Sequence, residues 1–258
     1  MNEEFCHCDL WAAEAYLTAL DANETKMLDM LHRGEKIHNW MWEETNKMFP
    51  QEVKDNDFVY KDAKQVVHLS NYGGGADKMH KENGLPLYVC QWMESKYHTT
   101  FPGIRMRMQR IEQELRATRT LTSLLGRKKI FFSLYNQEML NQAYAWPSQS
   151  VIGELTLIAL TKLYWMGIVH TNLKTKSVGG VVGVTDFIHN IPWTFPAMNT
   201  HDGMAIRCHK GNRKAVTESV RKAFNIPMKK NGLEIVIPVE IGWGDNFNDV
   251  SDVQVLRY

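Results

Sequence analysis

Segments that read as β-strands lie near the two ends of this chain, and the long stretch between them reads as helical. Residues 4–9 have the pattern of a short strand, and residues 197–208 and 234–242 read as further strands. With 258 residues, the chain can hold one large domain or two modest ones. Because strands far apart in the sequence must meet to form a sheet, this order predicts an α+β protein.

Proline and glycine separate the helical segments from one another. The spacing of apolar residues predicts helices over residues 12–20, 24–33, 38–48, 57–72, 87–99, 103–120, 148–165 and 213–224. Pro50 ends one of these helices, and the glycine triplet at 73–75 ends another. We expect residues 123–132 to turn at Gly126 and residues 178–184 to form a hairpin or loop.

Charge and cysteine content narrow the class of protein. The net charge is +1, so bulk charge does not by itself indicate a nucleic-acid partner. The four cysteines have no disulfide-like spacing, which favours a reducing cytoplasm, or the host cytoplasm if the source is viral. No signal peptide and no apolar run long enough to span a bilayer are visible, so we expect no membrane association.

One stretch of the chain is strongly basic. From Arg105 to Lys129, eight basic residues stand against Glu112 and Glu114. Such a stretch can dock a polyanion by displacing its counterions. It can equally be the solvated face of a helix, which composition alone favours.

Two acidic residues stand at the ends of predicted strands. Asp9 ends the first strand, and Asp202 lies in the turn between the two strands predicted within residues 197–208. Two carboxylates that converge from separate strands can hold two divalent cations for phosphoryl transfer. Aspartates at such places are also common as helix caps and turn formers.

One predicted helix carries a polar stripe. Lys64, His68 and Tyr72 are spaced four residues apart, so they lie on one face of the helix predicted over residues 57–72. A cation, an imidazole and a phenol in a row can meet a triphosphate, a base and a sugar. A mixed polar stripe of this kind can also simply face solvent.

Six segments of the chain resemble motifs of family A DNA polymerases, and they follow that family's order. They are residues 8–14 (motif A), 33–38, 64–75 (motif B), 125–129, 144–149 and 200–202 (motif C). Motif A pairs Asp9 with Glu14 five residues later, and motif B pairs Lys64 with Tyr72 eight residues later. Motif C ends in Asp202.

The resemblance implies a fold and a division of the chain. It implies a polymerase palm, an antiparallel sheet with helices, together with helical fingers. Residues 1–24 would be palm with motif A, 25–135 the fingers with the motif B helix at 57–72, and 136–258 palm with motif C at 199–203. A thumb and an exonuclease domain are absent, so a partner polypeptide carrying this N-terminal half is expected, as in a phage-type split polymerase.

The resemblance also implies template-directed DNA synthesis on primer-template DNA with dNTP substrates. Asp9 and Asp202 would be the catalytic metal ligands, holding two Mg²⁺ ions, with Mn²⁺ as a substitute. The implied nucleotide-binding residues are Lys64, His68, Tyr72, Glu14 and His38. The implied DNA-binding residues are Gln149, His201, Arg127 and Lys128. Glu14 would block a ribose 2′-hydroxyl, and Tyr72 would close on the nascent base pair and bond Glu14.

Three departures from the family pattern stand out. Tyr60 replaces an Arg one helical turn before Lys64, Gly203 replaces the Glu of motif C, and the stretch from 167 to 196 is longer than typical. Two other functions therefore stay open: a nucleotidyltransferase like the single-subunit RNA polymerases, and a non-catalytic DNA-binding remnant. Glu14 argues against the first, because ribonucleotides need the space that its carboxylate fills.

Overall fold

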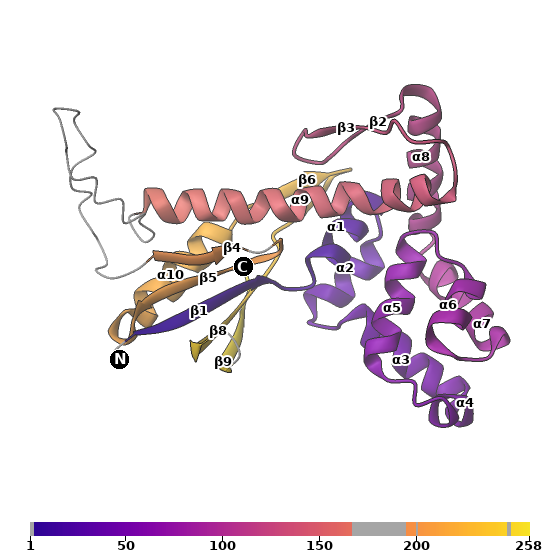
Figure 1. The fold of residues 1–258 in the computed structure, drawn as a ribbon, viewed down its shortest axis with the longest axis horizontal. Helices are drawn as coiled ribbons and strands as arrows, with labels where there is room; N and C mark the ends of the chain where they lie inside the picture. Colours follow the sequence, from indigo (N-terminus) through magenta and orange to yellow (C-terminus); the bar gives the residue numbers. More distant parts are fainter. Residues whose placement is uncertain (1–2, 167–194, 200, 247–248) are drawn as a thin grey trace. The chain divides into compact units, whose positions relative to one another are not determined.

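The computed structural model describes residues 3–166, 195–199, 201–246 and 249–258, and the hairpin or loop predicted at 178–184 lies outside them. The chain divides into two compact units. The sheet unit comprises Met1–Ala13, Ile152–Pro227 and Val236–Tyr258, and the helical unit comprises Glu14–Val151 and Met228–Ile235. The predicted α+β class is confirmed, with an antiparallel sheet in one unit and a cluster of helices in the other (Figure 1).

Segments from both ends of the chain build the sheet unit. Its five antiparallel strands follow the order β4 (Phe195–Asn199), β5 (Gly203–His209), β1 (Glu3–Leu10), β8 (Val239–Asn246) and β9 (Asp249–Leu256). A short 3₁₀ turn, Lys210–Asn212, leads from β5 into α10 (Arg213–Phe224), which packs on β1 and β8. Strand β1 therefore has neighbours on both sides, supplied by the chain itself.

Alternation along β1 separates a buried face from an accessible one. Glu4, Cys6, Cys8 and Leu10 are buried, whereas the residues between them are more exposed. Cys6 and Cys8 point to the same side, so this strand does not present a Cys-His-Cys metal site. Glu4 is buried but ion-paired, because Arg213 of α10 reaches it with an Nη2–Oε2 distance of 2.6 Å.

The helical unit contains most of the middle of the chain. Its helices are α1 (Ala13–Ala22), α2 (Thr25–His32), α3 (Ile37–Met48), α4 (Pro50–Asp55), α5 (Tyr60–Asn71), α6 (Ala76–Asn83), α7 (Leu87–Thr100), α8 (Gly103–Thr118) and the first part of α9 (Gln137–Trp165). Two hairpins complete it: β2 (Thr120–Thr122) with β3 (Lys128–Ile130), and β6 (Met228–Lys230) with β7 (Leu233–Ile235). Among the described residues, no helix is both long and apolar enough to cross a membrane.

The helix predicted over residues 57–72 is shorter than expected. Asp57 adopts a left-handed backbone with φ of 48°, and α5 begins only at Tyr60. The Asp62 carboxylate accepts a hydrogen bond from the Val59 amide at 2.8 Å and so caps the helix start. Tyr72 lies one residue beyond the helix end, followed by Gly73 with φ of 79°.

A buried ionic cluster joins four elements of the helical unit. The Asp21 carboxylate of α1 receives Arg107 Nε at 2.5 Å and Arg110 Nη2 at 2.6 Å, both from α8, and also pairs with Lys230 of β6. Arg107 is fully buried and donates a second hydrogen bond to the Tyr144 carbonyl of α9. Two cations of the predicted basic stretch are thus structural, so that stretch is not one continuous solvated face.

Asp21→Asn is expected to destabilise the protein by about 3 kcal/mol at neutral pH, because Arg107 would stay buried without its counterion. Burial alone raises the pKa of the Asp21 carboxyl, but Arg107, Arg110 and Lys230 outweigh it and hold the pKa well below its usual range. This stabilisation is therefore present at neutral pH and lost as the pH falls below about 4. Denaturant unfolding across that pH range measures it.

The matched control for this prediction is Asp77→Asn, at an exposed aspartate on α6. We expect its unfolding free energy and its pH dependence to follow the unmodified chain. If Asp21→Asn unfolds at the same denaturant concentration as this control, the ionic cluster does not stabilise the fold.

Candidate functional site

The two predicted metal ligands lie on neighbouring strands of the sheet unit. Asp9 of β1 is directly opposite Gly203 of β5, and Asp202 is the residue before Gly203. The Leu10 amide donates to the Asp202 carbonyl at 2.9 Å, which ties the two strand ends together. Both aspartates are exposed. The antiparallel pairing of β1 with β5 thus brings together two carboxylates that are far apart in the sequence.

Gly203 has a steric reason to be glycine. A Cβ atom at this position would come too close to the Cys8 carbonyl oxygen and would lie 3.0 Å from Asp9 Oδ1. A larger residue would therefore push the Asp9 carboxylate or the two strands apart. The glycine that stands where the polymerase motif has a Glu keeps the Asp9 carboxylate close to β5.

The carboxylates fit a hard divalent cation by their chemistry. Mg²⁺ prefers oxygen ligands, keeps several waters, and is often bound through one or two carboxylates together with substrate phosphates. Asp9 and Asp202 supply two such exposed groups where β1 ends and β5 begins. In the part of the chain that the structure describes, no three His, Cys, Asp or Glu side chains gather into a metal-binding group.

His201 lies beside α9 in the same unit. Its ring is 3.5 Å from where a Cβ of Gly153 would be, so a small residue on α9 leaves room for the imidazole. Thr156 Oγ1 lies 3.4 Å from the His201 carbonyl oxygen. The backbone immediately before Asp202 is thereby attached to a helix.

The second set of predicted residues gathers in the helical unit, on α5. Lys64 is exposed and His68 is half-buried, while Ala63, Val66 and Val67 on the opposite side are buried. Gly73, with φ of 79°, turns the chain sharply after Tyr72. A Cβ at this position would meet the Tyr144 ring at 2.8 Å, so only glycine fits. Of the predicted polar stripe, Lys64 and His68 thus lie on α5, and Tyr72 is the residue after its end.

The Glu14 carboxylate is the centre of this set. Its Oε1 accepts a hydrogen bond from the Tyr72 hydroxyl and lies 2.8 Å from His68 Nδ1, and its Oε2 receives Gln149 Nε2 at 3.2 Å. Burial, followed by the negative charge of Glu14, raises the pKa of Tyr72 well above its usual range, so Tyr72 stays a neutral donor. Three predicted residues from two separate segments thus converge on the carboxylate of a fourth.

His38 lies near this set but outside the hydrogen-bond network of Glu14. Its ring, in the first turn of α3, is 6.0 Å from the ring of Tyr60. Burial and the charges of Lys36 and Lys64 lower the pKa of His38 to about 4. The imidazole is therefore neutral at pH 7 and can donate a hydrogen bond without adding charge.

Arg127 and Lys128 lie on the β2–β3 hairpin, and both are exposed. The predicted turn at Gly126 is present, with φ of 90° and a hydrogen bond from its amide to the Ser123 carbonyl at 2.9 Å. Lys129 stacks over the Phe131 ring, with Nζ 4.9 Å from its centroid. The hairpin therefore presents its basic residues to solvent.

One hydrogen bond that holds the end of α5 was not predictable from the sequence. Asn71, the last residue of α5, is buried and accepts a hydrogen bond from the Tyr97 hydroxyl at 2.6 Å. This contact fixes the end of α5 next to Tyr72 from the side of α7. An Asn at a buried position of a helix indicates only weakly that a hydrogen-bond partner comes from elsewhere in the fold. Nothing in the sequence identifies Tyr97 as that partner.

Three comparisons with known proteins bear on this site. A family model described as DNA polymerase family A matches residues 2–249. A search of curated proteins finds no match. Among solved structures, the POL domain of Pol1 from M. smegmatis, in complex with DNA primer-template and dNTP, is similar with a TM-score of 0.69 at 14% identity. The similarity covers 94% of this chain and 40% of that one, so this chain spans less than half of its solved relative.

Proposed function

This chain belongs to DNA polymerase family A, and from that premise we propose that it adds deoxynucleotides to a primer 3′-hydroxyl under the direction of a template. The observation that carries the proposal is the position of Asp202 next to the residue that faces Asp9 across two paired strands. Both carboxylates are exposed.

The sheet unit would hold the metal ions and the primer end. Asp9 and Asp202 would bind Mg²⁺, or Mn²⁺ in its place, and two such ions supply charge neutralisation and hydroxyl activation when bound. His201 would position the primer terminus, because its backbone leads directly into Asp202 and is attached to α9 through Thr156.

The helical unit would bind the incoming nucleotide. Lys64 is exposed on α5 and would neutralise the triphosphate. His68 would lie near the base and sugar, and Tyr72 would close on the nascent pair. The hydrogen bonds of both residues to Glu14 support this assignment, because they hold the two rings on one side of the helix end.

Three further residues would contact the duplex. Gln149 would face the minor groove, since its amide is held beside Glu14. Arg127 and Lys128 would contact DNA phosphates, which position a duplex without reading its sequence. Their exposure on the β2–β3 hairpin supports this role.

The test of the proposed function is primer extension with Mg²⁺ and all four dNTPs on a primed template. We expect nucleotide addition that follows the template and stops when Mg²⁺ is chelated. A chain that binds primer-template normally but adds no nucleotide under any of these conditions would instead match the non-catalytic alternative.

We also propose that an N-terminal polymerase half works with this chain. The support is its span of 40% of the solved relative. The sheet does not add to this support. An unpaired β1 would have needed a strand from a partner, but β1 lies between β5 and β8. Adding a candidate N-terminal half should lengthen the extension products. Processive synthesis by this chain alone would contradict the need for a partner.

His38 offers a test of nucleotide contact that does not require catalysis. Without nucleotide its pKa is expected at about 4, because burial disfavours the imidazolium and neighbouring lysines oppose it. A bound triphosphate would favour the charged form and raise this pKa. An NMR titration of the His38 ring with and without a dNTP measures the change. His32, exposed at the end of α2, should not respond to the nucleotide, and a His38 titration curve that stays in place would argue against the contact.

A further inference from the structure

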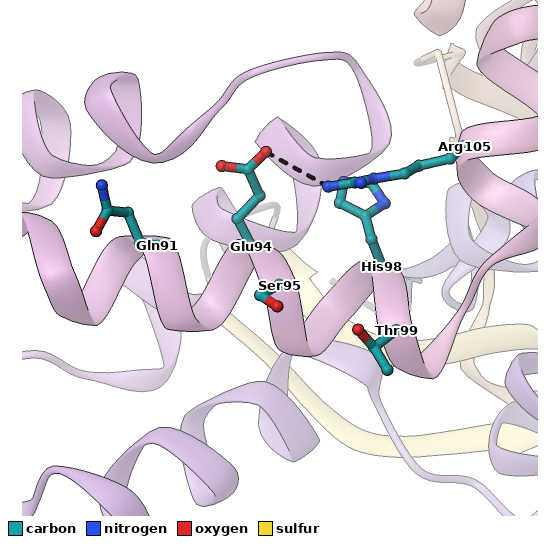
Figure 2. Close-up of a pocket in the computed structure, with 6 residues that line it drawn as sticks. All are labelled: Gln91, Glu94, Ser95, His98, Thr99 and Arg105. Carbon is teal, nitrogen blue, oxygen red and sulfur yellow. Dashed lines mark ion pairs between the residues drawn. The ribbon is translucent and has the colours of Figure 1, made fainter.

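A polar cavity of about 330 Å³ lies in the helical unit, apart from the Glu14 network. Its lining residues are Gln91, Glu94, Ser95, His98, Thr99 and Arg105. Figure 2 shows Glu94 and His98 rising from the same side of α7, with Arg105 of α8 extending toward them. The cavity is large enough for a small polar molecule.

The charges that line this cavity oppose each other. Arg105 Nη2 lies 3.8 Å from Glu94 Oε1, and both side chains are partly exposed. Burial, followed by the charge of Arg105, lowers the pKa of His98 to about 4, so this ring is neutral at pH 7. An anion would be attracted by Arg105 but repelled by Glu94. The lining better fits a neutral ligand that has an acceptor and a donor side by side.

His98 is the most buried residue of the cavity lining. Its side chain is only 8% exposed, and its Nδ1 has no hydrogen-bond partner among the described residues. Buried ring nitrogens are normally satisfied by protein, water or ligand, because leaving them unpaired is unfavourable. Nδ1 itself has almost no accessible surface, so a molecule in the cavity reaches it only if the ring turns.

We propose that this cavity binds a guanine base. Guanine carries the O6 acceptor next to the N1–H donor, with a second donor at N2. Arg105 can donate to O6 while Glu94 accepts from N1–H and N2–H, which matches a cation and a carboxylate that lie side by side. His98 could donate to N7 from Nδ1 once its ring turns toward the cavity.

Glu94 keeps enough acceptor capacity for this role. Its Oε2 already accepts a hydrogen bond from the Ala76 amide at 2.9 Å, at the start of α6. An ionised carboxylate offers about four acceptor sites, so most remain available. The same contact connects the cavity to the glycine turn at 73–75, which follows Tyr72.

The other bases fit this arrangement less well. Thymine has an acceptor beside one N–H donor, but it lacks the second donor for Glu94. Adenine and cytosine present an amino group beside a ring acceptor, which reverses the order and places like groups opposite each other. The expected order of affinity is guanine, then thymine, then adenine and cytosine.

The first experiment compares dGMP, dTMP, dAMP and dCMP by calorimetric titration of the full chain in EDTA, without primer or template. The four share one phosphate, so differences in affinity report the base. We expect dGMP to bind roughly tenfold more tightly than dAMP, in line with one bidentate base contact. The NMR signals of the His98 ring should shift with dGMP. Equal affinity for all four, or for inorganic phosphate alone, would overturn the proposal.

Variants assign the binding to these residues. Glu94→Gln keeps an oxygen for the Ala76 amide but replaces an acceptor for guanine with a donor, so the preference for dGMP should disappear. Arg105→Ala should weaken dGMP binding. Lys78→Ala, at an exposed residue of α6, is the control and should bind dGMP normally. Unchanged preference in Glu94→Gln would refute the cavity as the binding site.

The base can come from a free nucleotide or from single-stranded DNA. A short oligo-dA strand with one guanine, compared with the same strand without it, separates these sources by competition against dGMP. Competition only by the guanine-containing strand assigns the cavity to a strand base, and no competition assigns it to the free nucleotide. None of these measurements involves synthesis, so they can fail while primer extension succeeds, and the reverse.

Discussion

Asp202→Ala and Asp9→Ala are each expected to reduce primer extension by more than roughly a hundredfold, on the order seen when a group that anchors charge in the transition state is removed. The reason is the composition of the site. The two carboxylates are the proposed metal ligands where β1 ends and β5 begins, and Gly203 provides no third one. Single-nucleotide addition at saturating dNTP measures the effect.

The control for this pair is Asp249→Ala. Asp249 is an exposed aspartate of the sheet unit, at the start of β9, and its substitution should leave extension unchanged. Primer-template binding, measured by a mobility shift, should be kept in all three variants if the aspartates act through metal ions. Near-normal synthesis by Asp202→Ala would remove the basis for the proposed site.

Much of the fold follows from local sequence signals. The helices α7, α8 and α10 begin and end within two residues of their predicted bounds, because Pro86, the Pro102-Gly103 pair and apolar residues spaced three and four apart mark them. The two strands joined by a turn at His201–Gly203 are also present, as β4 and β5. These two strands are predictable from neighbouring residues alone, because proline and turn-forming residues mark where they begin and end.

The long helix shows why other elements could not be predicted. Residues 148–165 were expected to be helical, but α9 begins at Gln137 and continues through Pro147. A proline inside a helix removes a backbone hydrogen bond and normally ends the helix. Here the carbonyl that loses its partner is that of Ala143, and Arg107 donates to the neighbouring Tyr144 carbonyl at 2.7 Å. This contact comes from a distant segment, so no local pattern contains it.

The strand predicted over residues 234–242 is another instance. Residues 233–235 form β7 in one unit, and β8 begins at Val239 in the other, with Pro238 between them. Proline cannot donate to a ladder, and its carbonyl instead accepts from the Trp11 amide at 2.9 Å. The last strand, β9, was missed because most of its residues are exposed and carry no clear alternation.

The candidate site was predictable in composition but not in its contacts. Helical spacing predicts Lys64, His68 and Tyr72 on one face, and in the structure Lys64 and His68 lie on α5 while Tyr72 directly follows it. The approach of His68 and Gln149 to Glu14 depends on how α1, α5 and α9 pack, which spacing cannot give. The register that sets Asp9 opposite Gly203 likewise depends on strand pairing between the two ends of the chain.

Glu14→Ala is expected to raise ribonucleotide incorporation relative to deoxynucleotide incorporation by roughly tenfold or more, because overpacking one extra oxygen against a fixed side chain costs about 1–3 kcal/mol. The Glu14 carboxylate is held by hydrogen bonds with Tyr72, His68 and Gln149, so it cannot easily move aside for a 2′-hydroxyl. The ratio of kcat/KM for a dNTP and the matching rNTP measures this discrimination.

Glu14→Gln separates the volume of this side chain from its charge. Glutamine fills nearly the same space and its amide oxygen can still accept from Tyr72, so discrimination should largely persist if the effect is steric. Both variants are also expected to add deoxynucleotides more slowly, because Tyr72 and Gln149 lose a charged acceptor. A fixed carboxylate at this position should exclude the ribose 2′-hydroxyl. Equal use of rNTP and dNTP by the unmodified chain would therefore contradict this role of Glu14 and favour the alternative related to RNA polymerases.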